Sequence, residues 1–216
     1  ATPEDPASGR FGESFWEFLP RTVFGSLRSS VELEAQRIRR LGRSPWDPRT
    51  YLSNDVLNAW LMSVVLFGSL IAVFGPAVIP FLIVQAVYGF SLLESVNYLE
   101  HYGLLRQKTE SGRYERCAPK HSWNSDHLVT NLFLYHLQRH SDHHANPTRR
   151  YQTLRSMDGA PNLPSGYASL IGLTYIPPLW RRLMDHRVLD HYDGDITKVN
   201  IHPRVRDKVM AKYGVA

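Results

Sequence analysis

The sequence predicts an all-α protein, a membrane helix bundle with a transmembrane hairpin and a cytoplasmic helical cap. Two observations carry this prediction. The first is that no Asp, Glu, Lys or Arg occurs between Val56 and Leu93, although the mean hydropathy of the 216-residue chain is only −0.30. The second is that histidines gather after this run, in segments whose spacing fits helices. An uncharged stretch of this length is typical of a chain that crosses a bilayer.

The first expected element is a long helix from Phe15 to about Leu41. Its aromatic residues come first and its charged residues later, so Phe15, Trp16, Phe18 and Phe24 are expected at a membrane interface, where aromatic rings collect. The alternative is an amphipathic helix of a soluble protein.

The predicted hairpin covers residues 56–98. Val56 to Phe74 would be about 28 Å long as a helix, which matches the hydrocarbon core of a bilayer. Gly75 and Pro76 form the turn, and Ala77 to about Tyr98 runs back. Basic residues flank both ends, namely Arg37, Arg39, Arg40, Arg43 and Arg49 before the hairpin and Arg106, Lys108, Arg113, Arg116 and Lys120 after it. By the positive-inside rule, both ends lie on the cytoplasmic side.

The predicted cap covers about residues 99–190 and is followed by a polar tail, about 191–216. A helix is expected from about Ser125 to Asn146, with Ser122 or Asn124 as its cap and Pro147 after its end. On a helical projection, four histidines of this segment would share a sector of about 100°. These histidines are His136, His140, His143 and His144.

Imidazoles on one face, with no cysteine among them, indicate a transition-metal site. His101 lies at the inner end of the hairpin, where an ionisable group is usually functional. Glu100 and Asp142 could orient ligand rings by accepting their distal N–H groups, and His136 is a supporting candidate. Two alternatives stay open: a histidine-rich surface without metal, and zinc as the occupant, because the spacing does not choose between metals.

Two motifs carry a family resemblance: Asn-Tyr-Leu-Glu-His-Tyr-Gly at 97–103 and Leu-Gln-Arg-His-Ser-Asp-His-His-Ala-Asn-Pro-Thr-Arg-Arg-Tyr-Gln at 137–152. They resemble signature motifs of the integral-membrane alkane monooxygenases, a non-haem diiron family. The resemblance implies that His101, His140, His143 and His144 are iron ligands and that two iron ions are the cofactor. Two further histidine motifs of that family are absent here, so the chain, which begins at Ala1 without Met, is expected to be the C-terminal part of a single monooxygenase domain with its remaining ligands upstream.

The resemblance also implies an activity: O₂-dependent terminal hydroxylation of medium-chain n-alkanes to 1-alkanols, in the bacterial inner membrane, with the metal site on its cytoplasmic side. Rubredoxin, separate or fused, is the implied electron donor. The net charge of +5 and the pI near 9.4 suit an acidic partner, and no nucleic-acid motif is present. Candidate docking residues for the donor are Arg149, Arg150 and Arg155.

Two other functions remain open from the sequence. A membrane fatty-acyl desaturase or hydroxylase would have a related histidine pattern, and product analysis would separate it from an alkane monooxygenase. A zinc-binding membrane scaffold would have no redox chemistry, and metal analysis would identify it. The single cysteine, Cys117, excludes an internal disulfide framework.

Overall fold

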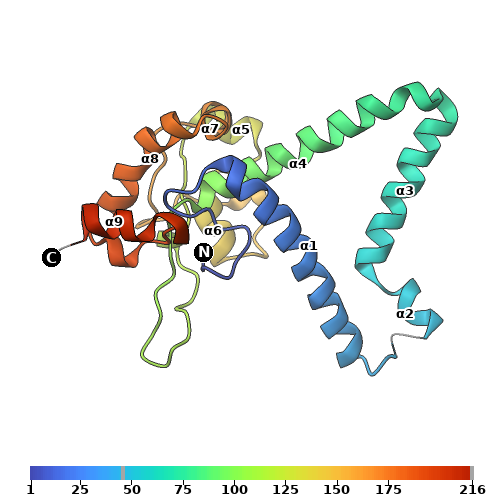
Figure 1. The fold of residues 1–216 in the computed structure, drawn as a ribbon, viewed down its shortest axis with the longest axis horizontal. Coiled ribbons are helices and arrows are strands. Elements are labelled where there is room, and N and C mark those ends of the chain that lie inside the picture. The colour runs from blue at the N-terminus through green and yellow to red at the C-terminus, as the bar shows by residue number, and fades with distance from the viewer. Residues whose placement is uncertain (45–46, 215–216) are drawn as a thin grey trace. The chain divides into compact units, whose positions relative to one another are not determined.

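The computed structural model describes residues 1–44 and 47–214, and every regular element within them is helical, which confirms the all-α prediction (Figure 1). The α-helices are α1 (Phe15–Arg40), α2 (Pro48–Leu52), α3 (Asp55–Phe74), α4 (Ile79–His101), α5 (Leu128–Phe133), α6 (His140–Ala145), α7 (Tyr167–Thr174), α8 (Pro177–His191) and α9 (Arg206–Tyr213). Residues 1–22 and 92–216 form one compact unit, the histidine unit, and residues 23–91 form a second, the hairpin unit.

In the hairpin unit, the predicted pair of long helices and the turn between them are confirmed. Asn54 caps α3, because its side-chain oxygen accepts a hydrogen bond from the Leu57 N–H at 3.0 Å. The helix ends at Phe74 because Gly75 adopts φ +77°, a left-handed value that glycine accepts without strain. A 3₁₀ turn at Pro76–Val78 then leads into α4.

Both helices are long enough to cross a bilayer. The apolar spans are Asp55–Phe74 with 20 residues and Pro76–His101 with 26 residues. None of the α3 side chains is buried, and Met62 and Val64 are 73% and 67% exposed. Contiguous apolar surface of this extent is unfavourable in water and is expected of a helix that faces lipid.

The long first helix is confirmed, but the predicted location of two of its aromatic side chains is wrong. Ser14 and Glu17 form a capping box, in which the Glu17 N–H donates to Ser14 Oγ at 3.2 Å and the Ser14 N–H donates to Glu17 Oε2 at 3.0 Å. Phe15 and Phe18 were expected at a membrane interface, yet both are completely buried in the core of the histidine unit. Trp16, in the first turn of the same helix, is exposed.

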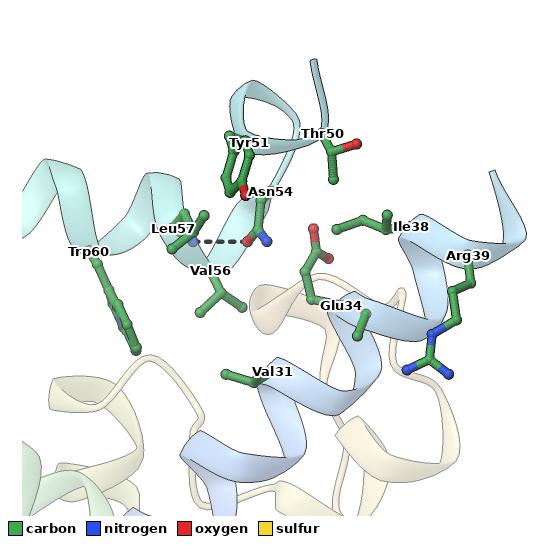
Figure 2. Close-up of a pocket in the computed structure, with 11 residues that line it drawn as sticks. Val31, Glu34, Ile38, Arg39, Thr50, Tyr51, Asn54, Val56, Leu57 and Trp60 are labelled. Carbon is green, nitrogen blue, oxygen red and sulfur yellow. Dashed lines mark hydrogen bonds between the residues drawn. The ribbon is translucent and has the colours of Figure 1, made fainter. Parts of the chain in front are cut away.

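A cavity of about 440 Å³ lies within the hairpin unit, between α1, α2 and α3 (Figure 2). Glu34 points into this cavity from α1. Its carboxylate accepts a hydrogen bond from Arg37 Nη2 at 2.6 Å and another from the Asp55 N–H at 3.1 Å. Glu34 therefore ties the end of α1 to the first turn of α3.

The core of the histidine unit is rich in aromatic side chains and surrounds the C-terminal end of α4. Tyr98 and Tyr102 are fully buried, and the ring of Trp180 from α8 lies 5.5 and 5.6 Å from theirs, measured between centroids. Each phenol has a hydrogen-bond acceptor: Tyr98 donates to the Glu13 carbonyl at 2.7 Å and Tyr102 to Asp185 Oδ1 at 2.8 Å. Burial with satisfied polar groups makes this region rigid and fixes the end of α4.

The segment predicted as a polar tail packs into the same core, as far as residue 214. Ile196, Val199, Ile201 and Val209 are buried, and the backbone of residues 200–202 pairs with Phe11. Because most residues of this segment are polar, the sequence did not predict that these four apolar side chains are buried. Their burial depends on contacts with residues distant in sequence. The last two residues of the predicted tail, 215 and 216, lie outside the described residues.

Candidate metal centre

His101 is the last residue of α4, and its side chain is buried. The chain turns away two residues later at Gly103, where φ is +73° and a Cβ atom would lie 2.8 Å from a Val188 methyl carbon. Only glycine fits this close approach of α4 to α8. The Gly103 N–H donates to the Gly9 carbonyl at 3.0 Å, and its own carbonyl accepts from the Asn200 N–H at 3.0 Å. The position of His101 is therefore determined by three segments that are distant from it in sequence, around Gly9, Val188 and Asn200.

The single helix expected from Ser125 to Asn146 is wrong. Two short helices, α5 and α6, flank a turn in which Tyr135 and His136 have φ values of +51° and +60°. Consecutive left-handed residues other than glycine interrupt any helix and persist only when the surroundings hold them. Here the His136 N–H donates to the Asn131 carbonyl at 2.8 Å. The expected face of four histidines is therefore reduced to the three on α6.

The six-residue helix α6 is held by side chains from outside it. Asn124 Oδ1 accepts hydrogen bonds from both the Ser141 N–H and the Ser141 hydroxyl at 2.9 Å. The predicted N-cap at Ser122 or Asn124 is wrong, because Arg139 precedes α6 and Asn124 bonds to this helix from 17 positions away. Pro147 follows the end of α6 as predicted. Gln138, fully buried just before α6, accepts from the Tyr167 N–H at 2.6 Å and from the Thr130 hydroxyl at 2.9 Å. This anchoring compensates for the low intrinsic stability of so short a helix.

Three of the predicted ligands converge. His101, His140 and His144 each present a ring nitrogen, and the three atoms all lie within 4.8 Å of one another. His140 Nε2 is 3.3 Å from His101 Nε2 and 2.8 Å from His144 Nε2. These three residues form the histidine triad of this protein.

The donor set fits a transition-metal ion. With metal–nitrogen bonds of about 2.0–2.1 Å, nitrogen ligands of one ion lie about 2.9 Å apart at right angles and about 3.4 Å apart at the tetrahedral angle. Both separations around His140 Nε2 are close to these values. Burial lowers the pKa of His144 to about 4 and holds the pKa of His140 well below its ordinary value. The rings are therefore neutral near pH 7 and offer lone pairs to a metal.

His143 and His136 are not part of the triad. The His143 ring is exposed, with its centroid 6.0 Å from those of His140 and His144. It borders a cavity of about 380 Å³ that is lined by Leu134, Tyr135, Leu137, His140, His143, Arg149, Tyr151 and Leu154. His136 lies in the left-handed turn, and its Nδ1 is 3.1 Å from the Tyr151 carbonyl oxygen.

The two carboxylates singled out from the sequence differ in their surroundings. Glu100 is buried against the triad, with its Oε2 3.3 Å from His140 Nε2. Asp142 is also buried, but its oxygens accept from Arg149 Nη1, from the Asn146 amide and from the Arg155 N–H, at 2.7–2.8 Å. Burial favours the neutral carboxyl of Asp142, but these hydrogen bonds outweigh it and lower its pKa. Asp142 therefore holds the segment after α6.

The arginines proposed as a docking face are not equivalent. Arg149 is 30% exposed and pairs with buried Asp142 at 2.7 Å. Arg150 and Arg155 are exposed. The positive charge of Arg149 is already compensated by a buried carboxylate, so Arg149 would attract an acidic partner less strongly than Arg150 and Arg155 would.

Sequence reasoning missed one buried contact of the site. Tyr167 is fully buried and donates a hydrogen bond from its phenol to Glu100 Oε1 at 2.9 Å. The two residues are 67 positions apart. No local pattern links them, and the loop character of the residues before Tyr167 gave no signal of a buried position.

Several known proteins are similar in sequence to this chain. Curated relatives include the alkane 1-monooxygenase of Acinetobacter baylyi, 56% identical over 215 residues, and alkane 1-monooxygenase 1 of Alcanivorax borkumensis, 47% identical over 215 residues. Each alignment covers 100% of this chain and 52% of the relative. A more distant relative is the xylene/toluene monooxygenase hydroxylase component XylM of Pseudomonas putida, 29% identical over 193 residues, which are 89% of this chain and 49% of that protein.

The chain thus spans about half the length of the curated relatives it matches. The names of these relatives confirm the resemblance to alkane monooxygenases. The two long apolar helices are those of a membrane protein. The model of one family, described as fatty acid desaturase, matches residues 1–196. Because this match covers most of the chain, the protein belongs to the fatty acid desaturase family.

Proposed function

We propose that this chain supplies part of the iron centre of an alkane 1-monooxygenase, which converts medium-chain n-alkanes to 1-alkanols with O₂. The observation that carries the proposal is the histidine triad, with His101 at the end of a helix long enough to span a membrane. The names of the relatives supply the reaction and the class of substrate. The triad alone supports a metal centre and does not select a reaction.

Iron bound in such a nitrogen-rich site activates O₂ for insertion into a C–H bond. The residues of this chain contribute position and environment. Buried His101 and the anchored helix α6 hold the donor atoms together, and exclusion of water strengthens their interaction with a cation. Alkanes dissolve in the bilayer, so the exposed apolar face of α4 would lead substrate toward its own last residue, His101.

Two iron ions are proposed, as in the family of the resemblance. The triad provides three ligands for the first ion, and His143, which borders the adjacent cavity, is proposed as a ligand of the second. The remaining ligands would come from the two family motifs that this sequence does not contain.

Product analysis tests the reaction. Membranes that contain the full-length protein, supplied with reductant, a rubredoxin-type donor and octane, are expected to form 1-octanol. The description of the matched family favours one competing candidate, a fatty-acyl desaturase. A double bond in an acyl chain, with no alcohol from octane, would support that candidate. Purified protein that contains zinc, and that stays inactive after reconstitution with iron, would instead support a structural metal site.

We also propose that the protein lies in the inner membrane of a bacterium with the triad on the cytoplasmic side, because basic residues flank both ends of the hairpin. The helix turn is then periplasmic. In a Cys117→Ser background, Ala77→Cys in the exposed turn is expected to react with an impermeant thiol reagent from outside the cytoplasm, whereas Ser111→Cys in the exposed connector is protected. Labelling in the opposite pattern would reverse the topology.

A further inference from the structure

One buried carboxylate connects the triad to a phenol that lies far away in the sequence. Glu100 Oε2 is 3.3 Å from His140 Nε2, and Glu100 Oε1 accepts a hydrogen bond from the Tyr167 hydroxyl at 2.9 Å. Glu100 is 1% exposed and Tyr167 is fully buried. A buried carboxylate is costly unless it is paired, so these two contacts determine where it lies.

Tyr167 is itself fixed at both ends. As the first residue of α7, it donates its backbone N–H to Gln138 Oε1 at 2.6 Å. The preceding residue, Gly166, packs so closely that a Cβ atom there would lie 2.2 Å from Thr130 Oγ1. Gln138 is two residues before His140, so the backbone and the hydroxyl of Tyr167 both connect to the site. Such double attachment leaves the phenol little freedom to move.

The direction of the hydrogen bond follows from burial. Burial and the neighbouring carboxylate raise the pKa of the Tyr167 phenol well above its ordinary value, so the hydroxyl keeps its proton and donates it. Removal of this donor would leave Glu100 Oε1 buried without its phenol partner. Loss of one partner of a buried polar group typically costs more than the net value of the bond.

We infer that Tyr167 is a positioning residue of the metal centre, which acts through Glu100 by holding its carboxylate against the triad. The inference rests on the proposed metal site and extends it, because it identifies the group that orients a carboxylate next to the ligand atoms. Hydrogen-bonded groups behind a metal site commonly change metal affinity or activity 10- to 100-fold when they are removed.

The test uses Co²⁺, whose visible absorption reports ligand geometry without any turnover. The full-length protein, purified in detergent and stripped of metal, is titrated with Co²⁺ as wild type and as Tyr167→Phe. The variant is expected to bind Co²⁺ about 10- to 100-fold more weakly and with a shifted absorption spectrum. Tyr192→Phe is the matched control, because Tyr192 is partly buried against the same core and its hydroxyl donates to the Leu105 carbonyl at 3.3 Å, outside the triad. The control is expected to lose stability but to keep the wild-type spectrum.

A double-mutant cycle separates positioning from general destabilisation. If Tyr167 acts through Glu100, then Tyr167→Phe combined with Glu100→Gln has less effect on Co²⁺ affinity than the sum of the single changes. Glu100→Gln alone is expected to shift the spectrum, which keeps the inference testable even if Tyr167→Phe does not fold.

The outcomes distinguish the inference from the proposed function. A wild-type spectrum in Tyr167→Phe, or strictly additive effects, overturns the role of Tyr167 while the metal centre stands. Wild-type protein that binds no Co²⁺ removes the proposed centre and the inference with it. Equal spectral shifts in Tyr167→Phe and Tyr192→Phe would assign the effect to loss of packing and also overturn the inference.

Discussion

Replacement of His140 by alanine is expected to abolish metal binding by the triad and hydroxylation with it. His140 is the shared member, since its Nε2 faces His101 Nε2 at 3.3 Å and His144 Nε2 at 2.8 Å. Loss of a direct ligand should exceed the effect of about 100-fold that is typical for groups behind the ligands. His101→Ala and His144→Ala are expected to behave alike. Iron content, measured on purified protein beside the rate of 1-octanol formation, checks the prediction.

His127→Ala is the matched control, because His127 is exposed and lies outside the triad. It should keep iron and activity, and all variants should insert into membranes as the wild type does. His143→Ala tests the proposed second iron and is expected to lose iron and activity as well. A His143→Ala enzyme with full iron content and full rate would remove His143 from the ligand set.

The pH dependence of metal binding should differ from that of exposed histidines. With its pKa lowered to about 4, the metal-free His144 ring stays neutral until the medium is strongly acidic, and the pKa of His140 is also well below its ordinary value. Protons compete with a metal only below these pKa values. Metal occupancy should therefore be flat from about pH 8 to about pH 5 and fall near pH 4, whereas ligands with the ordinary value of about 6.5 would begin to lose metal below it. A midpoint near pH 6.5 would contradict the lowered pKa values of His140 and His144.

The sequence predicted the hairpin well because its signal is local. An uncharged run of fixed length is favourable in lipid whatever the rest of the chain does, and Gly75 and Pro76 end one helix and begin the next through their own backbone preferences. His101, His140 and His144 could be found because histidines at motif spacing are rare, whatever the exact helix that carries them.

The features that the sequence did not predict depend on contacts between residues that are distant in sequence. The positive φ values of Tyr135 and His136 contradict their own preferences and are held by hydrogen bonds such as that of His136 N–H to the Asn131 carbonyl. Periodicity continued across this turn and suggested one helix. Phe15 was placed at a membrane interface because aromatic residues favour it, yet in the structure it is buried in the core. Tyr167 could not be linked to Glu100 by any pattern.

Reversal of charge at Arg150 and Arg155 is expected to slow electron delivery to the iron centre. Both side chains are exposed and follow α6, the helix that carries two members of the triad. We propose that they face rubredoxin, a small acidic protein, as the family resemblance implies. Complementary charge raises association rates about 10- to 1,000-fold, so Arg150→Glu with Arg155→Glu should lower turnover at subsaturating donor by about 10-fold or more. Saturating donor should restore most of the rate, because the metal ligands are unchanged.

The structure sets apart Arg149, which the sequence placed in the same group. Its guanidinium pairs with Asp142, so Arg149→Glu would place two carboxylates together beside α6 and should lower iron content and stability as well as turnover. Variants at Arg150 and Arg155 should keep iron. Iron content therefore separates a docking defect from damage to the centre.

Turnover measured against salt concentration tests the docking face independently of the variants. At an ionic strength of about 0.15 M the screening length is roughly 8 Å, so added salt should weaken docking well before it disturbs the triad. Wild-type turnover at low donor concentration should fall with added salt, and the double variant should respond much less because its attractive charge is already gone. Arg206→Glu with Lys208→Glu is the charge-matched control, since both residues are exposed on α9 and the net charge changes equally. If this control slows turnover as much as the pair after α6, the effect comes from the overall charge, and a docking face at Arg150 and Arg155 is excluded.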